Sequence, residues 1–183
     1  MYKKFLFTTM VFGLTSFGVI ANNFSLSSSD ISEGNQLTEN QVFSGFGCSG
    51  KNQSPQLSWD NVPKGTKSFV LTAYDPDAPT GSGWWHWVTF NIPANTNFLK
   101  TNASALEKMP KGAVQSVTDF GSFQFGGACP PAGEVHRYQF TLYALNVEKL
   151  ELGKSASPAL VGFMTKAHAI DSAKITAVYT RKK

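Results

Sequence analysis

Charged side chains are scarce in this chain of 183 residues, at 15% against the roughly one quarter that is usual in soluble domains. This scarcity excludes a disordered polyelectrolyte and a charged coiled coil. The net charge of +4 is not gathered into a basic stripe, and no recognised nucleic-acid motif is present, so we expect no nucleic-acid partner. Hydrophobic residues make up 42% of the chain and aromatic residues 13%, which suffices for the core of one domain.

Long apolar runs are absent except at the start of the chain. Residues 1–4 are a short basic start, residues 5–20 are apolar, and small residues lead up to Ala21. This pattern is typical of a secretory signal peptide over residues 1–21, with an uncleaved membrane anchor as the alternative. We therefore expect an exported, periplasmic protein, with 22–183 as a single domain and no membrane span after signal removal. Without the signal peptide the net charge falls to +2.

Cysteine is also rare, because the chain holds only Cys48 and Cys129. The absence of a CxxC spacing argues against a zinc site. In an exported protein the default expectation is a disulfide bond between the two residues, which closes a loop of about 80 residues and contributes about 4–5 kcal/mol at most. A reactive thiol and a pair of metal ligands remain as alternatives.

Several segments alternate at period two and are rich in Val, Phe, Thr, Tyr and Trp, which predicts strands. They are residues 68–74, 85–92, 137–145 and 174–180. One helix is predicted after Ser157, an N-cap residue followed by Pro158, with a buried face formed by Leu160, Phe163, Met164 and Ala167. The sum is a mostly β domain of antiparallel sheets with a few short peripheral helices.

Three ionisable residues extend the apolar faces of predicted strands. Alternate residues of a strand share a face. Asp75 therefore shares the face of Phe69, Leu71 and Ala73, and His86 shares that of Val88, Phe90 and Ile92. His136 shares the face of Tyr138, Phe140, Leu142 and Ala144. If the strands are antiparallel neighbours, these three side chains meet at one edge of the sheet. Such groups at an apolar rim either satisfy each other or line a pocket.

The segment before His136 favours the pocket. Residues 126–133 are rich in glycine and proline, so their amides can approach a ligand closely and form a nest for an anion. A disulfide bond at Cys129 would attach this loop to the region around Cys48. We therefore expect that Asp75 accepts a hydrogen bond from His86, and that both histidines donate to an anion that the loop amides also hold.

Two long motifs resemble a known family. The first runs from Asp75-Pro76-Asp77-Ala78-Pro79 through Trp85-His86-Trp87-Val88 to Asn91-Ile92-Pro93, and the second from Gly127 through Pro130-Pro131 and Gly133 to His136-Arg137-Tyr138. Both are similar to signatures of the phosphatidylethanolamine-binding proteins, also called Raf kinase inhibitor-like proteins. Asp119-Phe120-Gly121, Ser54-Pro55 and Tyr143-Ala144-Leu145 resemble the bacterial YbhB/YbcL branch.

The resemblance implies two antiparallel β-sheets with peripheral helices and a small cavity that binds an anion such as phosphate or a phosphorylated head group. We expect no cofactor and no metal. A protein partner, whose activity the chain would inhibit or modulate, and a homodimer remain open. The ligand-binding residues carried over by position are Asp75, Asp77, His86, Trp87 (with Trp84 as its alternative), Gly127, Ala128, Cys129, Pro130, His136 and Tyr138.

An enzyme is the alternative function. A hydrolase could use a dyad of Cys129 and His136 if the thiol is free, and a metal-dependent enzyme could use His86 and His136. No Gly-x-Ser-x-Gly motif is present, and no Ser or Thr stands beside either histidine in the sequence. We therefore expect a binding protein rather than an enzyme.

Overall fold

The computed structural model describes residues 23–105 and 108–182, so the predicted signal peptide lies outside the described residues. The strands are β1 (Ser25–Ser27), β2 (Ser44–Gly45), β3 (Cys48–Ser49), β4 (Leu57–Asp60), β5 (Ser68–Asp75), β6 (Trp84–Pro93), β7 (Phe98–Leu99), β8 (Val114–Gln115), β9 (Val135–Leu145) and β10 (Ala169–Thr180). One α-helix, α1 (Pro158–His168), is present in the described part of the chain. None of its helices is long and apolar enough to cross a membrane.

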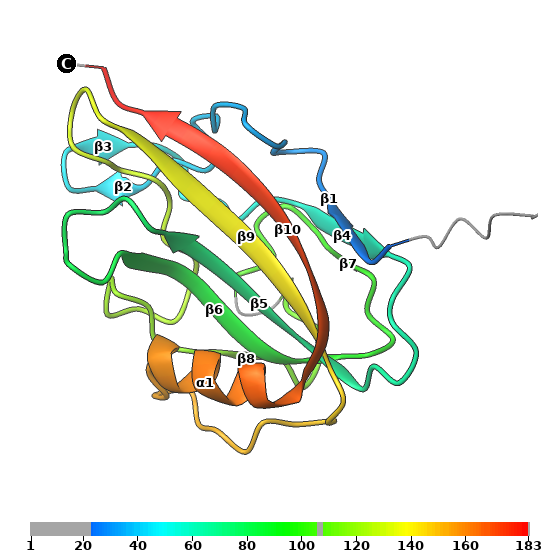
Figure 1. Cartoon of the computed structure of the whole chain (residues 1–183). Helices are drawn as coiled ribbons and strands as arrows, with labels where there is room; N and C mark the ends of the chain where they lie inside the picture. Colours follow the sequence, from blue (N-terminus) through cyan, green and yellow to red (C-terminus); the bar gives the residue numbers. More distant parts are fainter. Residues whose placement is uncertain (1–22, 106–107, 183) are drawn as a thin grey trace, which may run out of the picture.

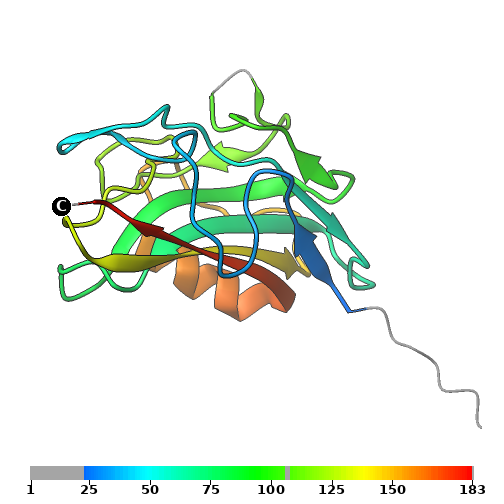
Figure 2. The ribbon, with the colours of Figure 1, turned by 90° about the horizontal axis from the view of Figure 1, so that it is seen from above.

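A five-stranded antiparallel sheet of order β10-β9-β5-β6-β8 forms the centre of the molecule (Figure 1). A three-stranded sheet of order β1-β4-β7 lies against one face, and α1 covers the other (Figure 2). Strands β2 and β3 make a separate hairpin. The predicted mostly β fold of antiparallel sheets is therefore confirmed.

Strand β5 lies in the middle of the large sheet, and seven of its eight residues are buried. Its alternate residues enter two separate cores. Phe69 and Leu71 face the small sheet, together with the buried Trp59, whereas Val70 faces α1. A strand buried on both faces is stable only between two layers, which explains the position of β5.

The outer strand β10 is partly covered by a segment from the start of the domain. The amides of Gly34 and Leu37 donate to the carbonyl oxygens of Thr176 and Val178, at 2.8 and 2.7 Å. These bonds satisfy part of the edge that β9 does not pair, and so they limit edge-to-edge association.

Simple alternation along β6 assigns His86 to the wrong face of the sheet. Strand β6 carries two β-bulges against β5, and His86 is the extra residue of one, between Trp87 opposite Ala73 and Trp85 opposite Tyr74. Val88 and Phe90 face α1, whereas His86 lies on the opposite side of the sheet. An inserted residue changes the parity of a strand, so simple alternation fails here.

The helix begins as predicted but turns a different face to the sheet. The side chain of Ser157 accepts a hydrogen bond from the amide of Leu160, and Pro158 occupies the first turn. The fully buried residues are Val161 and Thr165, and Met164 packs against the core as predicted, whereas Phe163 is 70% exposed. Apolar residues surround this short helix, so its sequence does not decide which side faces the sheet.

Asn91 lies in the second bulge of β6, between Thr89 and Ile92, and its substitution tests the role of this bulge. Its backbone is in the left-handed region, with φ of 57°, and its side chain bonds the amide and the carbonyl of Leu150 at 2.8 and 3.2 Å. We expect Asn91→Ala to lower the free energy of unfolding by about 1–3 kcal/mol, since it orphans Leu150 and strains the backbone. Asn91→Gly should lose less, because glycine adopts this φ without strain. Urea denaturation measures both, and equal losses would contradict the backbone contribution.

Candidate functional site

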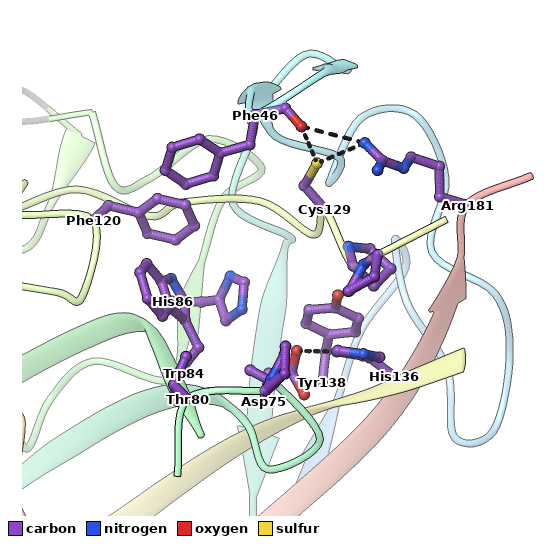
Figure 3. Close-up of a pocket in the computed structure, with 14 residues that line it drawn as sticks. Phe46, Asp75, Thr80, Trp84, His86, Phe120, Cys129, His136, Tyr138 and Arg181 are labelled. Carbon is purple, nitrogen blue, oxygen red and sulfur yellow. Dashed lines mark hydrogen bonds and ion pairs between the residues drawn. The ribbon is translucent and has the colours of Figure 1, made fainter. Parts of the chain in front are cut away.

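A cavity of about 300 Å³ opens at the end of the large sheet where β5 ends and β6 and β9 begin (Figure 3). Of the ten predicted ligand-binding residues, the cavity is lined by Asp75, His86, Cys129, Pro130, His136 and Tyr138. It is also lined by Trp84, the alternative to Trp87. The remaining four, Asp77, Trp87, Gly127 and Ala128, do not line it.

Asp75 and His136 form a buried pair on the cavity wall. The Nδ1 atom of His136 lies 2.7 Å from Oδ2 of Asp75, and their side chains are only 3% and 4% exposed. The Oδ1 atom of Asp75 accepts the amide hydrogen of Asp77 at 2.8 Å, which closes the turn after β5. The expected hydrogen bond between Asp75 and His86 is therefore wrong, because the carboxylate bonds the other histidine.

The second ring nitrogen of His136 is also engaged. Its Nε2 atom lies 3.2 Å from Oε2 of Glu134, a half-exposed carboxylate. Burial alone would lower the pKa of His136, but the hydrogen bonds and charges of Asp75 and Glu134 outweigh burial and raise the pKa. The protonated ring therefore donates to two carboxylates.

His86 has the opposite character. Its Nδ1 atom lies 2.7 Å from the carbonyl oxygen of Gly126, and since a carbonyl only accepts, Nδ1 carries a hydrogen. Burial lowers the pKa of His86 against the smaller raising effects of Gly126 and Asp75, which favours the neutral ring. In that tautomer Nε2 holds a lone pair, so His86 offers the cavity an acceptor rather than the predicted donor.

Three buried polar atoms of the cavity residues have no hydrogen-bond partner among the described residues. They are Nε2 of His86, the hydroxyl of Tyr138 and Nε1 of Trp84. Burial raises the pKa of Tyr138 far above its ordinary value, so the phenol keeps its hydrogen. Buried polar groups are rarely left unbonded, and each such group needs an explanation. Together they offer two donors and one acceptor.

Asp77 and Trp87 have structural partners instead. Asp77 makes a bidentate ion pair with Arg137, with Nη2 at 2.6 Å and Nε at 2.9 Å from its two oxygens, and it accepts the Arg137 amide at 2.9 Å. The side-chain hydrogen bond of Arg137 lowers the pKa of Asp77 to about 2. The Nε1 atom of Trp87 donates to Gln115 at 2.9 Å within the core. The structure therefore gives these two residues supporting positions behind the cavity.

The expected nest of loop amides is also wrong for residues 126–128. The amide of Gly126 donates to His86, that of Gly127 to the side chain of Asn52, and that of Ala128 to Gln41, at 2.9, 2.6 and 2.9 Å. A Cβ at Gly127 would lie 2.4 Å from the Gln41 carbonyl oxygen. Glycine is needed here because two backbone segments pack closely, not because a ligand approaches.

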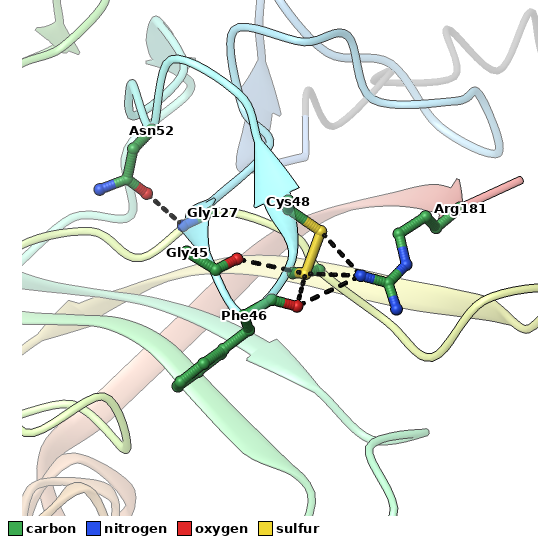
Figure 4. Close-up of a disulfide and its surroundings, with 7 residues drawn as sticks. Gly45, Phe46, Cys48, Asn52, Gly127 and Arg181 are labelled. Atoms are coloured by element: carbon green, nitrogen blue, oxygen red, sulfur yellow. Dashed lines mark hydrogen bonds between the residues drawn. A yellow bond between two sulfur atoms is a disulfide. The ribbon is translucent and has the colours of Figure 1, made fainter.

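The predicted disulfide bond between Cys48 and Cys129 is present (Figure 4). It ties the β2–β3 hairpin to the cavity wall, and Nη1 of Arg181 lies 3.2 Å from the carbonyl oxygen of Phe46 beside the two sulfurs. Arg181, Phe46 and Phe120 line the cavity but were missed by sequence reasoning. The disulfide was the one signal that could have found Phe46, since it predicts that the neighbours of Cys48 approach Cys129.

Within residues 23–105 and 108–182, no group of three or more His, Cys, Asp or Glu side chains could hold a metal ion. The thiol of Cys129 is consumed by its bond to Cys48, so the Cys129–His136 dyad has no nucleophile in this state. The structure does not support the alternative enzyme.

The comparison with known families matches residues 27–180 to the model of the phosphatidylethanolamine-binding protein family. The chain belongs to the phosphatidylethanolamine-binding protein family. The YbcL protein of Escherichia coli K12 is 50% identical over 182 residues, which cover 98% of this chain and all of YbcL. The YbhB protein of the same organism is 52% identical over 156 residues, 85% of this chain and 99% of YbhB.

Solved structures of family members agree with the fold. The crystal structure of E. coli YbcL superposes with a TM-score of 0.85 at 53% identity and covers 87% of this chain and 99% of YbcL. A homologue from Chlamydia trachomatis has a TM-score of 0.74 at 27% identity, over 88% of this chain and 99% of that chain. The resemblance to the YbhB/YbcL branch of the phosphatidylethanolamine-binding proteins is thus confirmed.

The raised pKa of His136 predicts how stability depends on pH. The contribution of this group is fully present below the unfolded-state pKa of about 6.5 and is lost as the pH rises through the higher folded-state pKa. We expect the urea midpoint to fall as the pH rises above about 6.5, and Asp75→Asn to reduce this fall, because it removes the charge that raises the pKa of His136.

The matched control is His168→Gln, which alters a histidine at the end of α1, outside the cavity lining. This variant should keep the full fall in the urea midpoint. An Asp75→Asn protein with the same pH profile as the unaltered chain would contradict the assigned pair.

Proposed function

We propose that this member of the phosphatidylethanolamine-binding protein family binds a small oxyanion, phosphate or the phosphoryl group of an organic phosphate, in the cavity at the end of the large sheet. The observation that carries the proposal is the set of unpartnered buried polar atoms on His86, Tyr138 and Trp84. A compact ligand with several oxygens can bond all three, because it presents acceptors and a hydrogen within a short distance.

The charges around the cavity favour an anion. Arg181 contributes a cation to the lining, and the raised pKa of His136 favours its protonated form. The carboxylate of Asp75 would repel an anion on its own, but its hydrogen bond to His136 compensates its charge. Glu134 accepts from the other side of the same ring and is absent from the cavity lining.

The tautomer of His86 defines the protonation state of the ligand. Its Nε2 atom accepts, whereas Tyr138 and Trp84 donate, so the complementary group carries at least one hydrogen as well as free oxygens. A singly protonated phosphate meets both needs. Sulfate has no hydrogen at neutral pH and would have to bind together with a proton on His86, which burial disfavours.

Titration calorimetry with inorganic phosphate tests this function. Tyr138→Phe removes one hydroxyl, and we expect it to weaken phosphate binding by roughly three- to tenfold, the usual worth of one hydrogen bond. Affinity should also fall as the pH rises through the raised pKa of His136, because the cavity wall then loses a positive charge, and sulfate should bind more weakly than phosphate.

Tyr143→Phe is the matched control, because Tyr143 packs in the core beside α1. This substitution should leave phosphate affinity unchanged. Absence of phosphate binding, or an affinity that is flat with pH and unaltered in Tyr138→Phe, would overturn the proposal.

We further propose that the protein is exported and works in the periplasm. The basic start and apolar stretch of residues 1–20 support export, and a disulfide bond is typical of oxidising compartments. A partner protein and a second copy of the chain stay predictions, and the binding proposal requires neither.

Mass spectrometry of the protein from a periplasmic extract tests export and oxidation together. We expect an intact mass that lacks residues 1–21 and is two hydrogens short of the reduced chain, because cleavage follows Ala21 and both cysteines are bonded. The same sample after reduction is the control, and it should gain the mass of two hydrogens. Full-length protein in the cytoplasmic fraction, or a mass unchanged by reduction, would contradict this proposal.

A further inference from the structure

An aromatic cluster stands at the mouth of the cavity, next to its polar atoms. Phe46, Phe120 and Trp84 line the same cavity as His86 and Tyr138 (Figure 3). The ring of Phe120 stacks on that of Phe46, with centroids 5.9 Å apart and planes 16° apart. It also meets the rings of Trp84 and His86 edge to face at 5.3 and 5.4 Å. The apolar mouth is thus continuous with the polar interior.

Phe46 is held in an unfavourable position. Its side chain is 70% exposed, and its backbone has φ of 53°, a left-handed conformation that is rare for a bulky residue. Glycine is the usual residue at such a turn position because it adopts a positive φ without strain. Here, however, a phenylalanine stands between Gly45 and Gly47. Backbone strain that the surroundings maintain is concentrated at ligand clamps and active sites.

The surroundings of Phe46 prevent the hairpin from relaxing. The Cys48–Cys129 disulfide bond joins it to the cavity wall, and Arg181 bonds the Phe46 carbonyl oxygen (Figure 4). Phe120, on which Phe46 stacks, lies directly over Gly126, where a Cβ would come within 2.3 Å of the Phe120 ring. Gly126 also accepts the hydrogen bond of His86. Gly126 therefore contacts both the aromatic cluster, through Phe120, and the polar interior of the cavity, through His86.

We infer that Phe46 is a specificity-determining residue that binds the apolar organic group of a phosphomonoester whose phosphoryl group occupies the polar end of the cavity. This inference rests on the proposed function and adds to it a preference for organic phosphates over inorganic phosphate. A cavity of about 300 Å³ accommodates a small organic group, and a planar ring can stack on the exposed Phe46.

The experiment compares phenyl phosphate with inorganic phosphate by titration calorimetry on the full mature chain at about pH 5, below the second pKa of about 6 of a phosphomonoester, so that both ligands carry a hydrogen. We expect phenyl phosphate to bind the unaltered protein roughly three- to tenfold more tightly, the usual worth of one aromatic pair. In Phe46→Asn the ratio of the two affinities should fall to about one, because asparagine tolerates a positive φ but offers no ring.

Two further variants distinguish the effect of the Phe46 ring from that of the disulfide bond that holds its hairpin in place. Phe163→Ala removes a phenyl group with the same 70% exposure from α1, and it should keep the preference for phenyl phosphate. The double variant Cys48→Ser with Cys129→Ser keeps Phe46 but frees the hairpin, and it should reduce the preference. Thermal unfolding verifies that each variant is folded under the conditions of the titration.

The outcomes distinguish this inference from the function beneath it. Binding of both ligands with an affinity ratio that Phe46→Asn leaves unchanged would overturn the role of Phe46 and leave phosphate binding intact. Equal affinities in the unaltered protein would do the same. Failure of the unaltered protein to bind either ligand would overturn the proposed function and this inference together.

Discussion

The hydrogen bond between Asp75 and His136 is the interaction on which the cavity depends. It joins the end of β5 to the start of β9 with both side chains almost fully buried. Removing two charged groups from water costs several kcal/mol for each unless they are paired, so loss of either partner leaves an uncompensated group inside the protein. The pair engages His136, whereas the cavity residues that carry unpartnered buried polar atoms are His86, Tyr138 and Trp84.

The meeting of Asp75, His86 and His136 at one edge of the sheet could be predicted from the sequence, but only two of the three faces were assigned by sound reasoning. Strands β5 and β9 alternate without interruption through the relevant residues, so counting by two places Asp75 and His136 correctly. Strand β6 contains two bulges. Counting by two wrongly places His86 on the face of Val88 and Phe90, and His86 reaches the cavity because it is the inserted residue of one bulge. The sequence has no strong signal for such a bulge.

Loop residues were harder to predict because they follow no period. The glycines at 126 and 127 indicated a close approach of backbone, which was right, but the partners are Phe120 and the segment around Gln41 rather than an anion. Which group fills the space beside a glycine depends on tertiary packing. Phe46, Phe120 and Arg181 reach the cavity from three separate parts of the chain, and only the disulfide linked one of these to the site in advance.

The bonds between the start of the domain and β10 have a kinetic consequence. Gln36 pairs with Val178, and the side chain of Gln36 bonds the Thr180 carbonyl oxygen across 144 positions, so this edge closes only after nearly the whole polypeptide has been synthesised. Folds dominated by pairings between distant residues fold slowly, because the entropy of loop closure opposes early contact. A nascent chain of this topology therefore remains without its completed sheet during translation.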